Sequence, residues 1–216
     1  MSEPAAPLLV VLDVDSTLAN EEGIDEIAKE AGPEVQRLVA DVTARAMAGE
    51  LDFAGSLIER VRALKGLSVE AIDAVTARVT ATFGAKALVD EVHRRGGRVC
   101  AVSGGFHELV DPLATGLGLD DWRANRLARS DGVLTGEVDG PIVDANAKKT
   151  WLLHWANKWG VPPTHIVAVG DGANDLVMMS EAAVSVAFVA KPIVRERALV
   201  SIDERDLSLV IDYLPA

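Results

Sequence analysis

Four short apolar runs along the chain each end in small or acidic residues. They cover residues 8–13 (LLVVLD), 98–105 (RVCAVSGG), 165–172 (HIVAVGDG) and 183–188 (AVSVAF). Continuous apolar runs of this length are typical of strands in a parallel sheet that is covered on both faces. The pattern therefore predicts four buried strands.

Amphipathic segments of helical length lie between these strands. Residues 86–96 (KALVDEVHRRG) and 147–160 (AKKTWLLHWANKWG) each end at a glycine, which is a common helix stop. Alternating strands and helices predict an α/β fold: an open, mostly parallel, Rossmann-like sheet with helices on both faces. In such sheets the ligand crevice lies beyond the carboxyl ends of the strands, where the polar clusters of this sequence fall.

The alternation is interrupted twice. Residues 21–32, 34–47, 52–64 and 68–83 have helical patterns with no convincing strand between them, which predicts an inserted helical cap. Residues 126–140 alternate around Asp131-Gly132, which predicts a small β-hairpin flap. We therefore expect a core domain of residues 1–18 and 84–216 and a cap domain of residues 19–83.

Composition narrows the function classes. The chain has 216 residues, 49% of them hydrophobic and 25% charged, and a net charge of −12. This charge disfavours nucleic acid or an anionic membrane as partner. The N-terminus lacks a signal-peptide pattern, and no apolar stretch has the roughly 18 residues of a membrane span. A single cysteine, Cys100, favours a reducing cytoplasm and gives no zinc motif.

The first candidate for chemistry is DVDST, which places Asp13 and Asp15 just beyond the first strand. Paired acids two residues apart can bind Mg²⁺ through hard oxygens, with one acid free as nucleophile and the other as proton donor. A turn or a helix cap would explain the same pair without any catalysis.

Two further clusters follow later strands. GDGANDLVMM supplies Asp171 and Asp175, a second acid pair that would complete a metal site. Helix capping would explain Asp171 but not the whole pattern. Ser103-Gly104-Gly105 offers a hydroxyl and open backbone amides to an anion, and Lys148 would add positive charge for a phosphoryl group, although read alone it is a solvated lysine.

Together these four elements resemble the motifs of the haloacid dehalogenase superfamily, in its order and spacing. The resemblance implies that Asp13 attacks phosphorus to form an aspartyl-phosphate, and that Asp15 protonates the leaving alcohol and later activates water. It also implies Mg²⁺ held by Asp13, the backbone carbonyl of Asp15 and Asp171, with Asp175 supporting the water shell of the metal and Lys148 among the groups that hold the phosphate.

The resemblance narrows to the phosphoserine phosphatases through DVDSTLANEEGIDEIAKEAG, SGGF, NAKKTWL, GDGANDLVMM and AKPIVRERA, which together cover nearly the whole chain. The cap of that family reads the amino-acid part of the substrate, with Glu22 matching the ammonium partner and Arg60 the carboxylate partner. A solvated helix face would explain either residue alone. The implied substrate-binding set is Glu22, Met47, Phe53, Arg60, Ser103, Gly104, Gly105 and Asn174.

The resemblance thus implies Mg²⁺-dependent hydrolysis of O-phospho-L-serine, the last step of serine synthesis, and we expect a cytoplasmic monomer or homodimer. Because the chain starts almost directly at the first strand, we do not expect the amino-acid-sensing domain that some relatives carry. One alternative is a phosphatase or phosphotransferase of the same fold acting on another small phosphate ester. Another is a receiver-like module that holds a phospho-aspartate as a signal. The cap, and the position of Asp15 where it can activate water, argue against the receiver.

Two side-chain patterns are expected to be structural. Trp151, Trp155 and Trp159 recur every fourth residue, which places three indoles along one helical face and predicts a core or subunit contact. His107 follows the anion cradle closely enough to reach the mouth of the site, so a minor role with substrate is one alternative, and an exposed helix position is the expectation.

Overall fold

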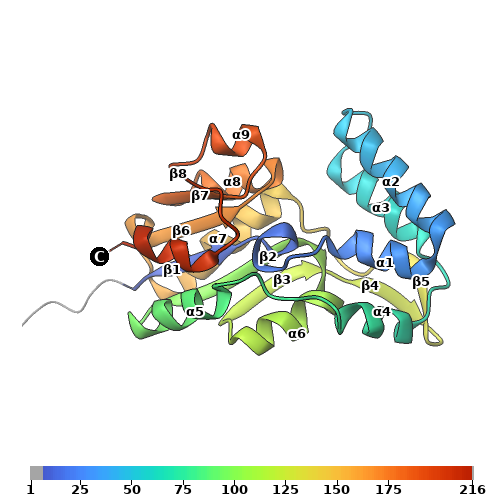
Figure 1. Ribbon diagram of the computed structural model, residues 1–216, viewed down its shortest axis with the longest axis horizontal. Helices are drawn as coiled ribbons and strands as arrows, with labels where there is room; N and C mark the ends of the chain where they lie inside the picture. Colours follow the sequence, from blue (N-terminus) through green and yellow to red (C-terminus); the bar gives the residue numbers. More distant parts are fainter. Residues whose placement is uncertain (1–6, 216) are drawn as a thin grey trace, which may run out of the picture.

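A six-stranded parallel sheet forms the centre of the computed structural model, which describes residues 7–215. The strand order is β3-β2-β1-β6-β7-β8 (Figure 1). The strands are β1 (Leu9–Leu12), β2 (Arg98–Phe106), β3 (Asp121–Asn125), β6 (Ile166–Gly170), β7 (Val184–Phe188) and β8 (Val200–Ile202). The four predicted strands are confirmed as the inner ones, and the two edge strands went unpredicted.

Helices cover both faces of the sheet, and this part of the prediction is confirmed. Val10 and Leu12 of β1 pack on one face with α5 (Ala85–Arg94), α6 (His107–Leu117) and the 3₁₀ segment Leu207–Tyr213. Leu9 and Val11 pack on the other face with α7 (Ala145–Trp159), α8 (Leu176–Met179) and α9 (Pro192–Arg195). Because successive side chains alternate, each apolar residue of β1 is buried on one face or the other.

The tryptophan face of α7 belongs to the core, as expected. Trp155 is fully buried, while Trp151 and Trp159 are partly buried against the same cluster. The guanidinium of Arg123 lies over the ring of Trp151 at 4.3 Å from its centroid, a cation–π arrangement that ties α7 to the edge strand β3.

A helical group and a hairpin form the other end of the molecule (Figure 1). The helices are α1 (Gly23–Ala31), α2 (Pro33–Met47), α3 (Phe53–Ala63) and α4 (Val69–Thr76), and the hairpin consists of β4 (Leu127–Ser130) and β5 (Val133–Val138). One apolar cluster joins them, and it includes Ile27 and Leu57 of the helices and Leu134 of the hairpin. The hairpin turn has left-handed backbone at Asp131 (φ 52°) and Gly132 (φ 79°), as the sequence predicts.

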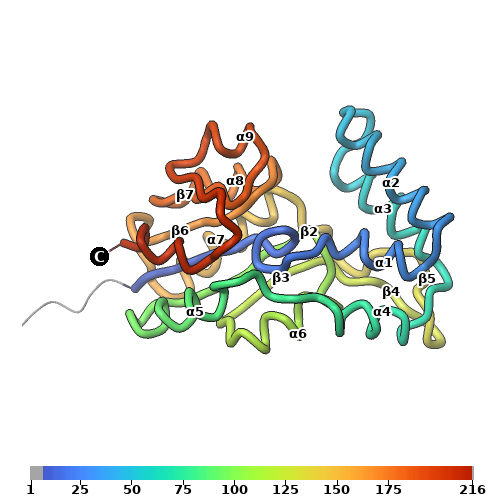
Figure 2. Tube along the Cα trace, in the orientation of Figure 1, coloured from blue at the N-terminus to red at the C-terminus, as the bar shows by residue number. Residues whose placement is uncertain are grey.

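The chain enters and leaves the helical group along two adjacent segments, which Figure 2 traces. Ala19 and Ala81 form an antiparallel bridge, the amide of Asn20 donates to the carbonyl of Thr80 (3.1 Å), and the amide of Thr82 donates to Leu18 (2.9 Å). These bonds explain why α4 stops at Thr76 rather than running to residue 83. The domain limits at 18/19 and 83/84 remain a prediction. No helix among residues 7–215 is long and apolar enough to span a membrane.

Candidate active site

The loop after β1 is shaped so that two carboxylates face the same point. The amide of Asp13 donates to the carbonyl of Val169 in β6 (2.9 Å), which extends the sheet register by one residue. The helical turn Val14–Leu18 follows, and Ser16 within it has left-handed backbone (φ 56°). A non-glycine residue in this region costs on the order of 1 kcal/mol or more, so the surrounding contacts must hold the turn in place.

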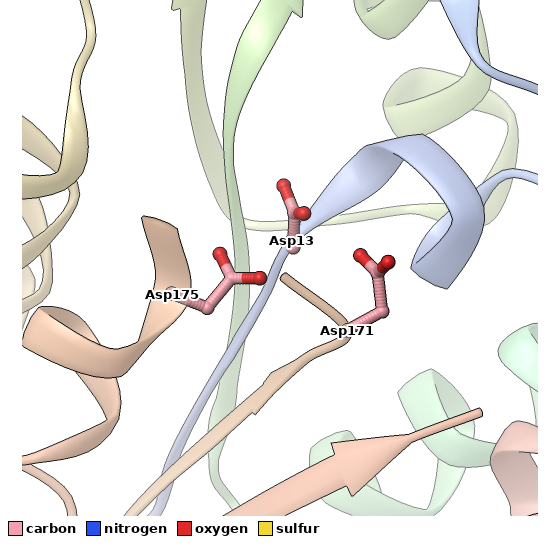
Figure 3. A group of neighbouring side chains, drawn as sticks. All are labelled: Asp13, Asp171 and Asp175. Carbon is pink, nitrogen blue, oxygen red and sulfur yellow. The ribbon is translucent and has the colours of Figure 1, made fainter. Parts of the chain in front are cut away.

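Three carboxylates from two strand ends meet at this edge of the sheet (Figure 3). Asp13 follows β1, Asp171 follows β6, and Asp175 lies in the turn that leads into α8. One carboxylate oxygen from each lies within 4.8 Å of the others. Such a group of hard oxygens fits a divalent cation, because the mutual repulsion of the acids leaves the site short of positive charge.

Lys148 of α7 lies between two of these acids. Its Nζ is 2.6 Å from Asp13 and 2.7 Å from Asp175, and the side chain is only 1% exposed. Burial alone would lower the pKa of Lys148, but the attraction of both carboxylates outweighs burial and raises it. Lys148 is therefore a permanently charged, fixed cation.

Burial and mutual repulsion have the largest effects on the pKa values of Asp13 and Asp171. Burial, reinforced by the charge of Asp175, raises the pKa of Asp13 well above its ordinary value, against the opposing attraction of Lys148. Burial and the same neighbour raise the pKa of Asp171 to about 6. Both oxygens of Asp175 have donors, Lys148 and the amide of Gly172. The carboxylate of Asp171 has none among residues 7–215, so it is the most available ligand.

Asp15 is oriented by the cap and by β2. One of its oxygens accepts from the amide of Gly23 at the start of α1 (2.8 Å), and the other accepts from the hydroxyl of Ser103 (2.8 Å). That hydroxyl in turn accepts from the amide of Gly105 (2.7 Å). A Cβ at Gly105 would lie 2.6 Å from Asp15, and one at Gly104 would lie 2.7 Å from Phe53. Close packing against the acid therefore requires glycine at 105, whereas a side chain at 104 would have to displace the ring of Phe53.

The cap supplies the opposite wall of a cavity of about 120 Å³. Glu22 accepts a hydrogen bond from the hydroxyl of Ser16 (2.6 Å), and burial raises its pKa. Burial lowers the pKa of Arg60, whose Nε donates to the carbonyl of Ser56 (3.3 Å). The residues that line the cavity are Asp13, Asp15, Glu22, Ile24, Phe53, Leu57, Arg60, Gly104, Gly105, Asp171, Gly172, Asn174 and Lys191.

Two predicted substrate contacts, Ser103 and Met47, do not line this cavity. Met47 lies away from it. It is 79% exposed at the end of α2 and lines a separate hollow between α1 and α2. Spacing along a helix cannot show whether its last residue reaches a cavity formed by other elements. Ser103 and Lys148 lie behind the cavity wall, where they contact Asp15 and Asp13 directly.

Two residues at the site are not among the predicted site residues, although Lys191 lies in the AKPIVRERA segment that carries the resemblance. Lys191 lines the cavity and follows β7, so its position at a strand end was the available signal. Asn125 is buried at the end of β3, where its amide donates to the carbonyl of Gly104 (2.8 Å) and its oxygen accepts from the amide of Val143 (2.8 Å). Asn125 thus joins the glycine cradle to the loop before α7.

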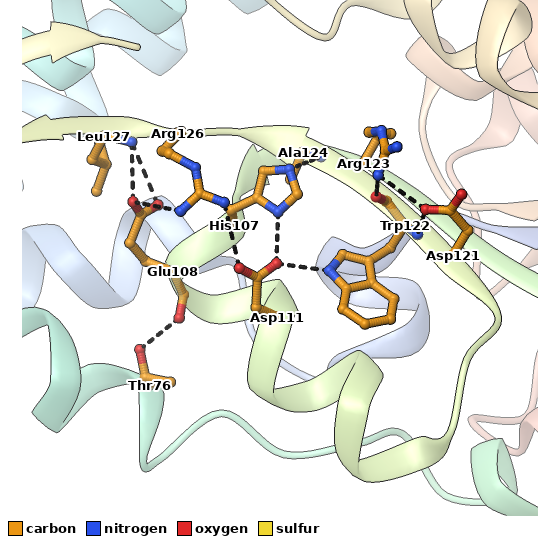
Figure 4. A network of polar contacts seen from close by, with 10 residues as sticks. All are labelled: Thr76, His107, Glu108, Asp111, Asp121, Trp122, Arg123, Ala124, Arg126 and Leu127. Carbon is orange, nitrogen blue, oxygen red and sulfur yellow. Dashed lines mark hydrogen bonds and ion pairs between the residues drawn. The ribbon is translucent and has the colours of Figure 1, made fainter. Parts of the chain in front are cut away.

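A polar network fixes β3 and the start of α6 behind this cradle (Figure 4). Nδ1 of His107 lies 2.6 Å from Asp111, and its Nε2 accepts from the amide of Ala124 (3.2 Å). Asp111 also accepts from the indole of Trp122 (2.7 Å). The prediction that His107 is exposed is therefore wrong, because Asp111 and Ala124 hold the ring between α6 and β3, with 15% of the side chain exposed.

An acid pair follows β1, a buried lysine contacts it, and two further acids follow β6, with an inserted cap over all of them. This arrangement defines a class of hydrolase. The chain belongs to the haloacid dehalogenase-like hydrolase family, whose model matches residues 10–180. It is 52% identical over 206 residues to a phosphoserine phosphatase of Streptococcus thermophilus, covering 95% of both chains. It is 45% identical to one of Methanocaldococcus jannaschii, covering 95% of this chain and 97% of that one.

Solved structures of phosphoserine phosphatases have a backbone similar to that of this chain. A phosphoserine phosphatase solved as a phospho-aspartyl intermediate analogue superposes with a TM-score of 0.90 and 43% identity, covering 97% of this chain and 100% of the other. A substrate-bound phosphoserine phosphatase complex gives the same TM-score and identity, covering 97% and 99%.

Proposed function

We propose that the chain hydrolyses O-phospho-L-serine to L-serine and phosphate, with Mg²⁺ as its metal. One observation carries this proposal: Asp13 and Asp15 face the same cavity as the Glu22 and Arg60 pair. The cavity, at about 120 Å³, suits a small polar metabolite rather than a ligand of several hundred Å³. The similarity to phosphoserine phosphatases at about half identity over nearly the full length supports the same substrate.

Recognition follows from the charges of the substrate. Phosphoserine carries one ammonium and one carboxylate on its α-carbon, and Glu22 and Arg60 offer one complementary partner for each. Phe53 and Leu57 of the same helix present apolar surface toward the methylene between these groups and the phosphate. A sugar phosphate lacks both charges and would leave Glu22 and Arg60 unpaired, which costs binding energy.

Chemistry would take place in two displacements at phosphorus. An oxygen of Asp13 attacks phosphorus, and the bond from phosphorus to the seryl oxygen breaks. Asp15 gives its proton to that oxygen, so serine leaves with a neutral hydroxyl group. Asp15 then takes a proton from water, the water oxygen attacks phosphorus, and the bond to Asp13 breaks to release phosphate. The hydrogen bonds from Gly23 and Ser103 hold Asp15 in the orientation that both steps need.

Mg²⁺ would be held by Asp13, the backbone carbonyl of Asp15 and Asp171, with Asp175 behind them, and would supply positive charge to the phosphoryl oxygens. Lys148 holds Asp13 by one oxygen and leaves its other oxygen available for attack. As part of the proposal, residues 19–83 form a cap that closes over the core, Met47 reaches the substrate in that closed form, and the protein works in the cytoplasm as a monomer or homodimer. The buried, unpaired Cys100 fits a reducing compartment.

Phosphate release from L-phosphoserine tests the proposal, with Mg²⁺ or EDTA present and with phosphothreonine, a sugar phosphate and an aryl phosphate for comparison. We expect metal-dependent release that Asp13→Asn abolishes. Arg60→Ala should raise KM for phosphoserine about a hundredfold, because a buried charged partner is lost, and affect the aryl phosphate far less. Arg62→Ala is the matched control, since Arg62 is exposed on the same helix and lines a different hollow.

Turnover of the aryl phosphate without turnover of phosphoserine would keep the displacement chemistry and refute the substrate assignment. Full activity in Asp13→Asn would refute the mechanism itself. Equal rates for phosphoserine and the sugar phosphate would favour the alternative of a less selective phosphatase.

A further inference from the structure

Lys191 is a cation at the cavity that the chemistry above does not use. It precedes α9 and lines the cavity together with Glu22 and Asp171. Unlike Lys148, it is exposed, and its ammonium has no carboxylate within ion-pair distance among residues 7–215. Its charge acts on the cavity nonetheless, because it lowers the pKa of Glu22 and of Asp171 against the stronger effect of burial.

The backbone around Lys191 is held firmly, so the side chain projects from a fixed point. The amide of Lys191 donates to the carbonyl of Asp171 (3.0 Å), and its carbonyl accepts from Val194 (2.9 Å). Nε of Arg195 donates to the carbonyl of the preceding residue, Ala190 (2.7 Å). Lys191 therefore keeps its place beside the acid loop when other parts of the cavity move.

An anionic substrate meets an unfavourable field on its way to the phosphate position. The protein has a net charge of −12, and four carboxylates line the cavity: Asp13, Asp15, Glu22 and Asp171. Lys148 is buried behind this wall and already paired with two acids, so its charge is largely cancelled at the entrance. A phosphate ester of charge near −2 needs an uncancelled cation at the entrance to approach quickly.

We propose that Lys191 is a substrate-binding residue whose ammonium attracts the phosphate of the incoming ester into the cavity. The proposal rests on the function proposed above and adds a residue to it. Arg60 is committed to the carboxylate of the substrate and lies on the cap, whereas Lys191 lies on the core beside Asp171, on the side where phosphorus must meet Asp13. A dianionic phosphate is therefore the group that gains most from Lys191.

Steady-state kinetics of Lys191→Gln across a range of ionic strength tests this role. At about 10 mM salt we expect kcat/KM for phosphoserine to fall about tenfold, with the loss mainly in KM. The loss should shrink at about 300 mM salt, because screening weakens the same attraction in the parent protein. Lys191→Arg, which keeps the charge, should recover most of the loss.

Lys65→Gln is the matched control, because Lys65 is also exposed and also lacks an ion-pair partner within residues 7–215, but lines a hollow away from the site. It makes the same change in net charge and should leave both kcat/KM and its salt dependence unaltered. Equal effects of the two variants, or a loss in Lys191→Gln that is independent of salt, would overturn the proposal.

Binding of inorganic phosphate separates this proposal from the assignment of phosphoserine. Calorimetry with phosphate and Mg²⁺ should show about tenfold weaker binding in Lys191→Gln than in Lys65→Gln. If the parent protein does not hydrolyse phosphoserine but this difference persists, the substrate assignment fails and the role of Lys191 stands. If phosphoserine is hydrolysed and phosphate binds both variants equally, the role of Lys191 fails alone.

Discussion

Positive charge is scarce among the buried acids of the site. Lys148 is shared between Asp13 and Asp175, and within residues 7–215 Asp171 faces other carboxylates without an ion-pair partner. The metal-free protein therefore keeps an electrostatic penalty in its folded state. That penalty is the physical reason that a divalent cation binds, and it can be measured separately from catalysis.

Asp171→Asn should stabilise the metal-free protein while it abolishes metal-dependent activity. The pKa of Asp171 is raised to about 6 in the folded state, above its ordinary value of 3.8. Because the folded pKa is higher, the metal-free protein loses stability as pH rises from about 4 to about 6. At pH 7 the variant should gain on the order of 1–2 kcal/mol, or a few degrees in Tm.

Thermal unfolding in EDTA at pH 4.5 and pH 7 measures this effect, and the gain should be smaller at the lower pH. Mg²⁺ should raise the Tm of the parent protein but not that of the variant. A variant less stable than the parent at pH 7 in EDTA would show that repulsion at Asp171 does not lower the stability of the metal-free protein.

Loss of Lys148 should destabilise the fold strongly. Lys148→Met leaves Asp13 and Asp175 buried without their cation, which costs about 3–5 kcal/mol in urea unfolding. The double variant Lys148→Met with Asp175→Asn should recover part of the stability and none of the activity. Lys149→Met removes the neighbouring, partly exposed ion pair with Glu181 and should cost less than about 1 kcal/mol. Similar costs for the two single variants would contradict this account.

The sequence predicts best those site residues whose neighbours in the chain carry the signal. Asp13 with Asp15, and Asp171 with Asp175, are pairs within single loops, and the strand ends bring the loops together. Lys191 and Asn125 have no such local partner, and they reach the site only through the sheet order and the packing of β3. Their contribution depends on contacts distant in sequence, which a local pattern does not contain.

At the scale of elements, the end of β2 is tightly fitted against the acid loop. Gly105→Ala should lower kcat at least a hundredfold, because a Cβ there would lie 2.6 Å from Asp15 and displace its carboxylate. Gly116→Ala in α6 is the control, since a Cβ at that position meets nothing within 4 Å. It should keep full activity and stabilise the helix by about 0.5–1 kcal/mol. Comparable activity in the two variants would show that Asp15 tolerates displacement.

The two edge strands, β3 and β8, are the strands that the apolar pattern of the sequence does not predict. The inner strands are apolar on both faces and were predicted, as was the hairpin with its Asp-Gly turn. β3 reads DWRAN and β8 has three residues, so neither shows an apolar run. Each has one strand neighbour, and contacts with loops and helices elsewhere in the chain hold it in place.

At the scale of the whole molecule, the proposed chemistry requires that the helical group move toward the core once substrate is bound, to exclude bulk water from the aspartyl-phosphate. Orthovanadate with Mg²⁺ should therefore slow hydrogen exchange severalfold at the start of α1 and α3, which line the cavity. Exchange in α5, on the far face of the sheet, should not change. Equal protection of α1 and α3 with and without vanadate would count against closure.

The bridge between Ala19 and Ala81 has a consequence for how such a protein can diversify. Because the helical segment departs from and returns to nearly the same point, its length and content are not constrained by the sheet below it. A replacement of any size whose two ends lie equally close would join the core without disturbing Asp13, Lys148 or Asp171, provided that it supplies a backbone amide to Asp15 where Gly23 does now. Selectivity for a new ester could thus be acquired by exchange of one contiguous stretch of gene, with the reactive groups inherited unchanged.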